Sequence, residues 1–324
     1  MIKIMEQFQA EKETMASAYA AQMDKLMENP DVMELEADLG VCIMGAGMKE
    51  IARRHPGQLL NCGIQEANMV GVACGLSAVG KIPFLHSFAP FITRRANDQI
   101  FISGCYSGAN IRLVGSDPGI MAAYNGGTHM PFEDVAVLRA FPELTILEPT
   151  DNTMLKNLME QLVEKRGVYY LRTARKTMTK IYEDDSIFTI GKANILREGT
   201  DAAILATGIM VAEALRAAKI LNEEGISVRV VDMFTIKPLD REMVIQCAKT
   251  TGALVTAENH NIINGLGSAV SEVAGEHCPV PIERVGVQDC FGEVGDIEYL
   301  MEAFHLTAED IAEKVRTVIA RKRG

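Results

Sequence analysis

A single glutamate stands at the start of a small and apolar stretch. The segment NCGIQEANMVGVACGLSAVG, residues 61–80, contains Glu66 followed mostly by Ala, Gly, Val, Leu and Met. Apolar residues at helical spacing predict a helix from Glu66, with Met69, Val72 and Leu76 in a core and small residues that let another helix approach closely. A carboxyl group with so few polar neighbours suits proton transfer in a binding site. A glutamate that only stabilises the helix dipole fits equally well, so both interpretations stand at this point.

Aromatic and imidazole side chains follow in two short motifs. SFAPF places Phe88 and Phe91 just before or within the first turn of a predicted helix. Their faces can stack on a flat heterocycle or simply fill a core. YNGGTHMP places His129 just before Pro131, which suits a first helical turn. The helix dipole would then keep the imidazole neutral and able to polarise a substrate oxygen, although a lone histidine is more often structural.

Two arginines occur in the segment LRTARK. Arg172 ends a predicted strand at 168–172, and Arg175 comes shortly after it. Parallel sheets bind ligands at the carboxyl ends of their strands, and the guanidinium fork suits phosphate or carboxylate. Both arginines are therefore candidate substrate ligands, although a pair of surface cations gives the same pattern.

Strands that alternate with helices must position these side chains. The alternation predicts parallel sheets covered on both faces, and it restarts after the charged segment Glu183–Ser186. We therefore expect an α/β protein of two doubly wound domains, 1–184 and 185–324. The first should hold helices at 11–28, 48–54, 66–80, 91–103, 131–140 and 151–165 between strands at 32–38, 59–62, 81–84, 111–115, 144–147 and 168–172. The second should hold helices at 211–223, 240–250 and 267–276 between strands at 203–206, 228–232, 253–257 and 282–287.

Composition limits the function classes. A net charge of −11 over 324 residues argues against binding nucleic acid or an anionic membrane surface. No apolar run approaches the roughly 20 residues that span a bilayer, and the N-terminus lacks the pattern of a signal peptide. Seven cysteines without metal-ligand spacing predict reduced thiols and a cytoplasmic protein with no metal site in this chain.

Longer phrases resemble a known family. GIQEANMVGVACGL resembles the GI-x-E-x-NMVG-x-A-x-GL segment of thiamine-diphosphate enzymes of the transketolase group. The resemblance continues through SFAPF, GGTH, the Arg175 region and VVDMFTIKPLD. The chain looks like the C-terminal half of a transketolase made as a separate polypeptide. This implies a pyrimidine-binding domain at 1–184 and a transketolase C-terminal-like domain at 185–324.

The resemblance implies roles for individual residues. In the family, a glutamate at the position of Glu66 hydrogen-bonds the pyrimidine ring of thiamine diphosphate and helps to remove a proton from the thiazolium carbon. Phe88 and Phe91 match the aromatic pair that sandwiches the pyrimidine, and Asp38 is a further expected cofactor contact. His129 matches the histidine of the family's GxTHQ motif and is expected to be catalytic.

The same resemblance implies a set of substrate contacts. Arg175 aligns with the arginine that grips the terminal phosphate of the donor sugar. The full expected set is Arg175, Arg172, Asn125, Asp117, Cys42 and His86.

Several of these positions depart from the family pattern. Thr14, Cys42 and Asp117 stand where transketolases usually have arginine, serine and histidine, and Tyr124 and Asn125 replace an acidic pair. A carboxylate beside a phosphate costs several kcal/mol if both stay charged and close. We therefore expect a donor other than an ordinary ketose phosphate, such as a branched, sulfonated or non-phosphorylated ketose.

The sequence also implies a partner. In the family a GDG…N motif on another domain holds the cofactor's diphosphate through Mg²⁺, which needs oxygen ligands, and the chain has no GDG. We expect an N-terminal transketolase subunit with this motif to hold Mg²⁺, in an α2β2 assembly. The second domain is expected to carry no catalysis, with Glu258, Asn259 and His260 serving packing or an interface.

The expected function is transfer of a two-carbon ketol unit from a ketose to an aldose phosphate. Three alternatives remain open: a β subunit of the first component of a 2-oxo acid dehydrogenase, a deoxyxylulose-phosphate synthase-like enzyme, and a regulatory homologue with a dead site. The sequence names neither sugar nor the partner chain.

Overall fold

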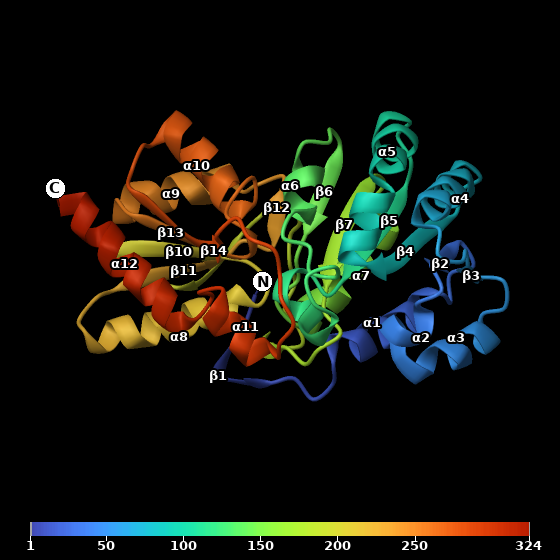
Figure 1. Cartoon of the computed structure of the whole chain (residues 1–324), viewed down its shortest axis with the longest axis horizontal. Helices are drawn as coiled ribbons and strands as arrows, with labels where there is room; N and C mark the ends of the chain where they lie inside the picture. Colours follow the sequence, from blue (N-terminus) through green and yellow to red (C-terminus); the bar gives the residue numbers. More distant parts are fainter. Residues whose placement is uncertain (1, 324) are drawn as a thin grey trace.

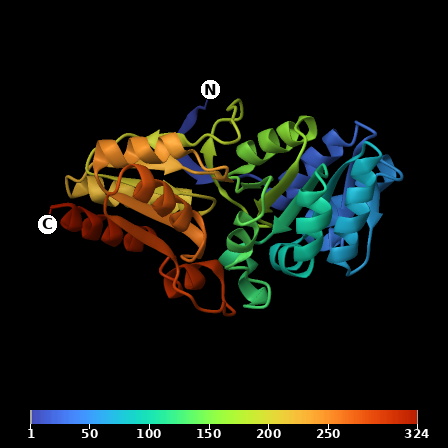
Figure 2. The same cartoon turned by 90° about the horizontal axis from the view of Figure 1, so that it is seen from above.

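Two α/β lobes make up the molecule. The computed structural model describes residues 2–323, and the lobes lie side by side along its longest axis (Figure 1). The first lobe contains a seven-stranded sheet and the second a five-stranded sheet. From above, the N-terminal end of the chain lies near the junction of the lobes (Figure 2). The expected fold class, two doubly wound α/β units, is confirmed.

The first sheet has the strand order β12-β6-β7-β5-β4-β2-β3. All its pairings are parallel except that of β12 with β6. The carboxyl ends of the parallel strands therefore share one edge. The strands are β2 (Val32–Glu36), β3 (Leu59–Asn61), β4 (Ile82–Phe88), β5 (Ile111–Ser116), β6 (Leu144–Leu147), β7 (Val168–Thr173) and β12 (Thr235–Lys237).

Helices cover both faces of this sheet. One face packs against α1 (Met15–Leu26) and α7 (Asn152–Glu164), and the other against α4 (Glu66–Ala78) and the segment that follows β4. Thr14 sets the start of α1, because its hydroxyl accepts a hydrogen bond from the Ser17 N–H. Shorter elements connect these: α2 (Gly40–Met44), η1 (Gly45–Gly47), α3 (Met48–Arg54), η4 (Gly119–Asn125) and α6 (Asp134–Arg139).

The second sheet has the order β14-β13-β10-β11-β9. In this sheet only β9 pairs antiparallel with its neighbour. The strands of the sheet are β9 (Asn194–Arg197), β10 (Ala202–Ala206), β11 (Val228–Asp232), β13 (Leu254–Asn261) and β14 (Ile282–Val287). Helices α8 (Met210–Glu223) and α12 (Ala308–Arg323) cover one face of this sheet. Helices α9 (Arg241–Thr251) and α10 (Leu266–His277) cover the other face. A short helix, α11 (Ile297–Ala303), packs beside η4 of the first lobe.

Several local expectations need correction. The helix expected at 91–103 is wound largely as π-helix, in η2 (Phe91–Arg95) and η3 (Ile100–Tyr106), with α5 (Asn97–Gln99) between them. The helix expected from Pro131 begins at Asp134. Val72, expected in the core, is exposed on α4.

Some strands gave no clear sequence signal. They are β9, β12 and the antiparallel pair β1 (Ile4–Ala10) and β8 (Thr179–Tyr182). Although β12 comes late in the chain, it pairs with β6 of the first sheet. The proposed boundary between residues 184 and 185 stays a prediction. No helix within residues 2–323 is long and apolar enough to cross a membrane.

Arg172 joins the two lobes from inside the core. Its guanidinium lies 2.8 Å from Asp134 and 2.7 Å from Glu148, and it donates to the Asn259 carbonyl of β13 at 3.2 Å. The side chain is 0% exposed. The prediction that Arg172 binds substrate is therefore wrong, because two buried carboxylates and a carbonyl of the second lobe take up its donors.

Replacing Arg172 with methionine should destabilise the chain by about 3–5 kcal/mol, because Asp134 and Glu148 would lose their cation inside the core. Denaturant unfolding of the purified chain measures this loss. Arg53→Met is the matched control, since Arg53 pairs with Glu50 on the surface, and its unfolding midpoint should stay near that of the unmodified chain. Equal midpoints for the two variants would contradict the structural role of Arg172.

Candidate active site

Glu66 begins helix α4 with its carboxylate out of water. Its side chain is 1% exposed. The Ser87 hydroxyl, on strand β4, donates to Oε1 at 3.3 Å, and Arg95 Nη1 lies 2.9 and 3.1 Å from the two carboxylate oxygens. A buried carboxylate needs such donors. The expected helix start at Glu66 is confirmed.

Arg95 is a site residue that the sequence reasoning missed. It ends the π-helical turn η2, four residues after Phe91, and its guanidinium lies 3.9 Å from the centroid of the Phe91 ring. Its side chain remains 45% exposed. The only available signal was the spacing of Phe91 and Arg95 along one helical turn. Arg95 thus links the buried carboxylate of Glu66 to the aromatic residues.

Three rings form the middle of the site. The centroids of Phe88 and Phe91 lie 5.8 Å apart, and His129 lies 5.4 Å from the first and 5.0 Å from the second. All three contacts are edge-to-face, an arrangement that aromatic pairs favour. Phe88 ends β4 and is buried, whereas Phe91 and His129 are partly exposed. The structure therefore brings together the two aromatic residues and the histidine singled out in the sequence.

Arg175 forms the far end of the same line of contacts. Its guanidinium lies 4.7 Å from the centroid of Phe88. Nη1 contacts Cys42 Sγ at 3.0 Å, and Nη2 donates to Asn125 Oδ1 at 3.3 Å. The remaining Nε–H pairs with Asp117, which follows β5. A continuous series of contacts thus runs from Glu66 to Cys42 along the carboxyl ends of neighbouring strands.

The charge state of His129 follows from its neighbours. Burial lowers the pKa of this imidazole, and the positive charges of Arg175, Arg95 and Arg94 lower it further. The helix dipole invoked from the sequence is not the cause, because α6 begins only at Asp134. His129 is therefore neutral at pH 7 and can donate or accept a hydrogen bond.

Two other predicted site residues lie apart from this line. His86 is buried on β4 against the Tyr19 ring, with Nδ1 3.5 Å from Glu34. Burial lowers the pKa of His86 to about 3. The prediction of a substrate contact for His86 is wrong, because its side of β4 is covered by α1. Asp38, after β2, is exposed and accepts a hydrogen bond from Asn61 at 3.0 Å.

The second lobe holds the loop that carries Asn125. The Asn259 amide accepts from the Ile120 N–H at 3.0 Å and donates to the Pro118 carbonyl at 2.9 Å. Gly119, at a φ of +55°, leaves no room for a Cβ against Asn259. The predicted packing role of Asn259 therefore extends to one side of the candidate site.

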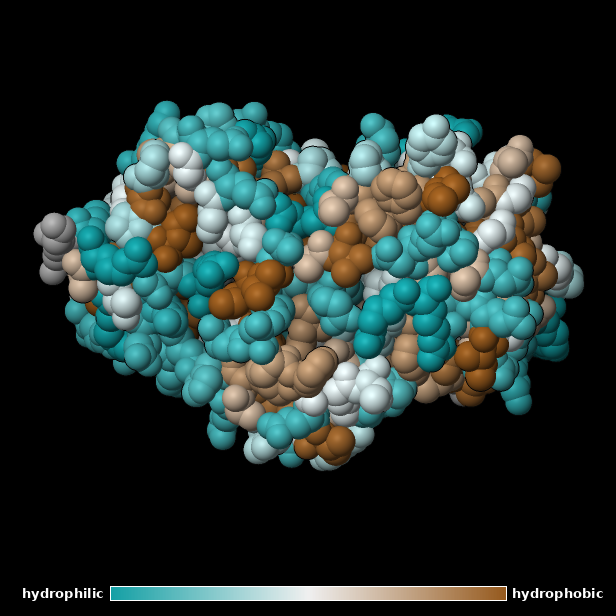
Figure 3. All heavy atoms as spheres, turned by 45° about the horizontal axis from the view of Figure 1, so that its top comes forward, coloured by the Kyte–Doolittle hydropathy of each residue, from teal (hydrophilic) through white to brown (hydrophobic). Residues whose placement is uncertain are grey.

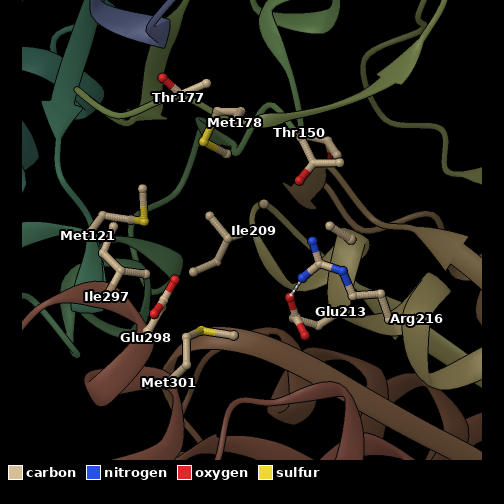
Figure 4. Close-up of a pocket in the computed structure, with 13 residues that line it drawn as sticks. Met121, Thr150, Thr177, Met178, Ile209, Glu213, Arg216, Ile297, Glu298 and Met301 are labelled. Carbon is tan, nitrogen blue, oxygen red and sulfur yellow. Dashed lines mark hydrogen bonds and ion pairs between the residues drawn. The ribbon is translucent and has the colours of Figure 1, made fainter. Parts of the chain in front are cut away.

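A separate hollow lies between the lobes. Its volume is about 220 Å³, and it borders the η4 loop only through Met121. Figure 4 shows methionine and isoleucine side chains around it, with Glu213 and Arg216 paired at one side. The side chains that form the contact series described above, which begins at Glu66 and ends at Cys42, do not line this hollow. Within residues 2–323, no group of three His, Cys, Asp or Glu side chains is placed to hold a metal ion.

The chain is similar to known proteins over most of its length. Residues 11–180 match the transketolase pyrimidine-binding domain, and residues 191–311 match the transketolase C-terminal domain. A 6-deoxy-6-sulfo-D-fructose transketolase subunit of Clostridium sp. (strain MSTE9) is 49% identical over 90% of this chain and 89% of its own. One subunit of an apulose-4-phosphate transketolase of Phocaeicola vulgatus is 37% identical over 74% of this chain and 77% of its own.

A solved structure is also similar over nearly the whole chain. It is described as a split gene transketolase, inactive beta4 tetramer. The two share 39% identity and a TM-score of 0.87, over 97% of this chain and 100% of the other.

The imidazole of His129 should titrate below its ordinary pKa of about 6.5, because burial and three arginines disfavour the charged ring. NMR titration of the chain, with His129→Asn to assign the signal, measures the midpoint. Arg175→Met should raise the midpoint, since it removes one cation, whereas Arg53→Met should leave it unchanged. A midpoint at or above 6.5 in the unmodified chain would contradict this description.

Proposed function

Because the chain belongs to the transketolase family, we propose that it is the C-terminal subunit of a two-chain, thiamine-diphosphate-dependent transketolase. It acts as a transferase only with its partner. The reaction moves a two-carbon ketol unit from an atypical ketose to an aldose phosphate. The observation that carries the proposal is the buried carboxylate of Glu66 at one end of the line of aromatic and basic side chains.

The residues present fit the pyrimidine end of the cofactor. Glu66 offers a carboxyl group to a ring nitrogen, and the partly exposed ring of Phe91, which packs against the buried Phe88, offers an aromatic face to a flat ring. Bound thiamine diphosphate supplies the carbon nucleophile that takes up the ketol unit. Arg95 shares the same carboxylate, so the guanidinium and the ring nitrogen compete for Glu66. The exposed side chain of Arg95 can move without disturbing the core.

The remaining side chains suit the sugar substrates. The neutral ring of His129 can donate a hydrogen bond to a substrate oxygen and withdraw or return a proton there. Arg175 presents Nη1 and Nη2 beside Cys42 and Asn125, where the terminal group of the donor would bind. Asp38 remains a proposed cofactor contact at the same edge of the sheet.

An exposed apolar surface next to Glu66 supports a partner subunit. Ile64 just before α4, Val72 on it and Val79 just after it are exposed, the last by 75%. Phe101, Ile102 and Tyr106 are exposed on η3, which packs against α4. Apolar residues gather at this end of the molecule in Figure 3. Exposed apolar surfaces of this kind mark protein interfaces. Gly71 and Gly75 on α4 face open space, so a helix of a partner could approach closely there.

We propose that this surface binds the N-terminal subunit, which carries the GDG…N motif and holds Mg²⁺ and the diphosphate. The solved relative is a tetramer of one kind of chain and is described as inactive. An α2β2 assembly would add the N-terminal subunit, and with it the site for Mg²⁺ and the diphosphate.

All seven cysteines are free thiols, which supports a cytoplasmic location.

Relatives and charge together suggest the donor. The 49% identical relative is named for 6-deoxy-6-sulfo-D-fructose, and another relative for apulose 4-phosphate. Asp117 beside Arg175 makes the site less favourable for a doubly charged phosphate. We therefore propose a sulfonated ketose as donor, with a branched sugar as the next candidate.

Reconstitution with the GDG-bearing partner tests the function. Ketol transfer from 6-deoxy-6-sulfo-D-fructose to glyceraldehyde 3-phosphate should require both chains, thiamine diphosphate and Mg²⁺. Full activity of the isolated chain would contradict the split-subunit proposal. Xylulose 5-phosphate as the best donor would contradict the atypical substrate, and pyruvate decarboxylation would favour the 2-oxo acid dehydrogenase alternative.

Glu66→Gln should lower ketol transfer by about 10²–10⁴-fold, because an amide neither accepts nor returns the proton. Exchange of the cofactor's thiazolium proton, followed by NMR in the assembled complex, should slow as well. Glu50→Gln, on the surface of α3, is the control and should change neither rate. Unaltered proton exchange in Glu66→Gln would place the catalytic carboxyl elsewhere.

A further inference from the structure

A buried carboxylate lies behind the arginine at the far end of the site. Asp117 is 0% exposed and follows the end of β5, in the centre of the first sheet. Its Oδ1 accepts from the Arg175 backbone N–H at 2.8 Å, and its Oδ2 pairs with the Arg175 Nε–H. A single carboxylate therefore fixes both the backbone and the side chain of Arg175.

This pairing limits what Arg175 can offer to an anion. The Nε edge, which arginine commonly uses for two-point binding of phosphate, is taken by Asp117. Only the outer end remains, where Nη1 contacts Cys42 Sγ and Nη2 donates to Asn125 Oδ1. The Phe88 ring covers one face of the guanidinium.

Asp117 offsets the charge of Arg175. Burial raises the pKa of Asp117, and the attraction of Arg175 and of Lys176 opposes this change. Asp117 accepts hydrogen bonds from the backbone N–H and the Nε–H of Arg175, which suits a carboxylate paired with a guanidinium. His129, on the loop side, has a lowered pKa and adds no charge at pH 7. An anion bound at Nη1 and Nη2 meets a guanidinium whose charge Asp117 offsets from the opposite side, with Arg94, Arg95 and Lys176 as the other cations nearby.

Phosphate and sulfonate differ under these conditions. A phosphate ester carries two negative charges above its second pKa of about 6, whereas a sulfonate carries one at every pH of interest. Repulsion from a fixed carboxylate grows in proportion to the charge of the anion. Asp117 therefore weakens the attraction of the site for a phosphate dianion more than its attraction for a sulfonate.

On the basis of the proposed function, we propose that Asp117 determines donor specificity. By orienting Arg175 and balancing its charge, Asp117 makes this end of the site accept a singly charged sulfonate in preference to a phosphate. Asp117 acts through Arg175 and does not itself touch the sugar.

The assembled two-chain enzyme tests this with two donors, 6-deoxy-6-sulfo-D-fructose and fructose 6-phosphate. Asp117→Asn removes the charge but keeps a side chain that tolerates the φ of +55° found at this position. The ratio of kcat/KM for sulfonate over phosphate should fall by about tenfold or more. Asp31→Asn, which removes a surface carboxylate paired with Lys81, should leave the ratio unchanged. An unchanged ratio in an active Asp117→Asn enzyme would overturn the inference.

The pH dependence of the same two enzymes provides a second test. The KM for fructose 6-phosphate of the unmodified enzyme, divided by that of Asp117→Asn, should rise as the pH rises through about 6, where the phosphate gains its second charge. The same quotient for the sulfonated donor should stay level. A level quotient for the phosphate, or a preference for phosphate in the unmodified enzyme, would overturn the inference while leaving ketol transfer intact. Absence of ketol transfer from every donor would overturn the proposed function itself.

Discussion

A carboxylate removed from water must find hydrogen-bond donors, and the first lobe is arranged to supply them to Glu66. One donor comes from Ser87, on the side of β4 that faces α4. The other comes from Arg95, at the end of the wide helical turn that follows β4. The strand, the turn and α4 therefore depend on one another. The aromatic residues Phe88 and Phe91 are held at the same edge of the sheet as a consequence.

The site has a similar design at both ends. At each end an arginine is paired with a buried carboxylate and lies over an aromatic ring: Arg95 with Glu66 and Phe91, Arg175 with Asp117 and Phe88. The neutral His129 lies between them. Asn259 of the second lobe holds the loop beside Arg175, so this lobe contributes to the site without supplying a reactive group.

Local patterns predicted the elements that carry the site, but not which faces are covered. The run of small and apolar residues after Glu66 predicted a helix from that residue, and the alternation of strands and helices predicted both sheets. Arg172 and His86 were mistaken for ligands because β7 and β4 lie within the sheet, where both faces are buried. Which face meets the other lobe depends on contacts distant in the sequence. Arg95 was missed because its position depends on π-helical winding, which periodicity does not reveal.

The most direct measurement is a crystal structure of the assembled two-chain complex with thiamine diphosphate. We expect a Glu66 oxygen within hydrogen-bond distance of the pyrimidine ring nitrogen, about 2.6–3.2 Å, with Phe91 against the ring and the diphosphate on the partner subunit. A Glu66 carboxylate still held by Arg95 alone, with the pyrimidine bound elsewhere, would contradict this expectation.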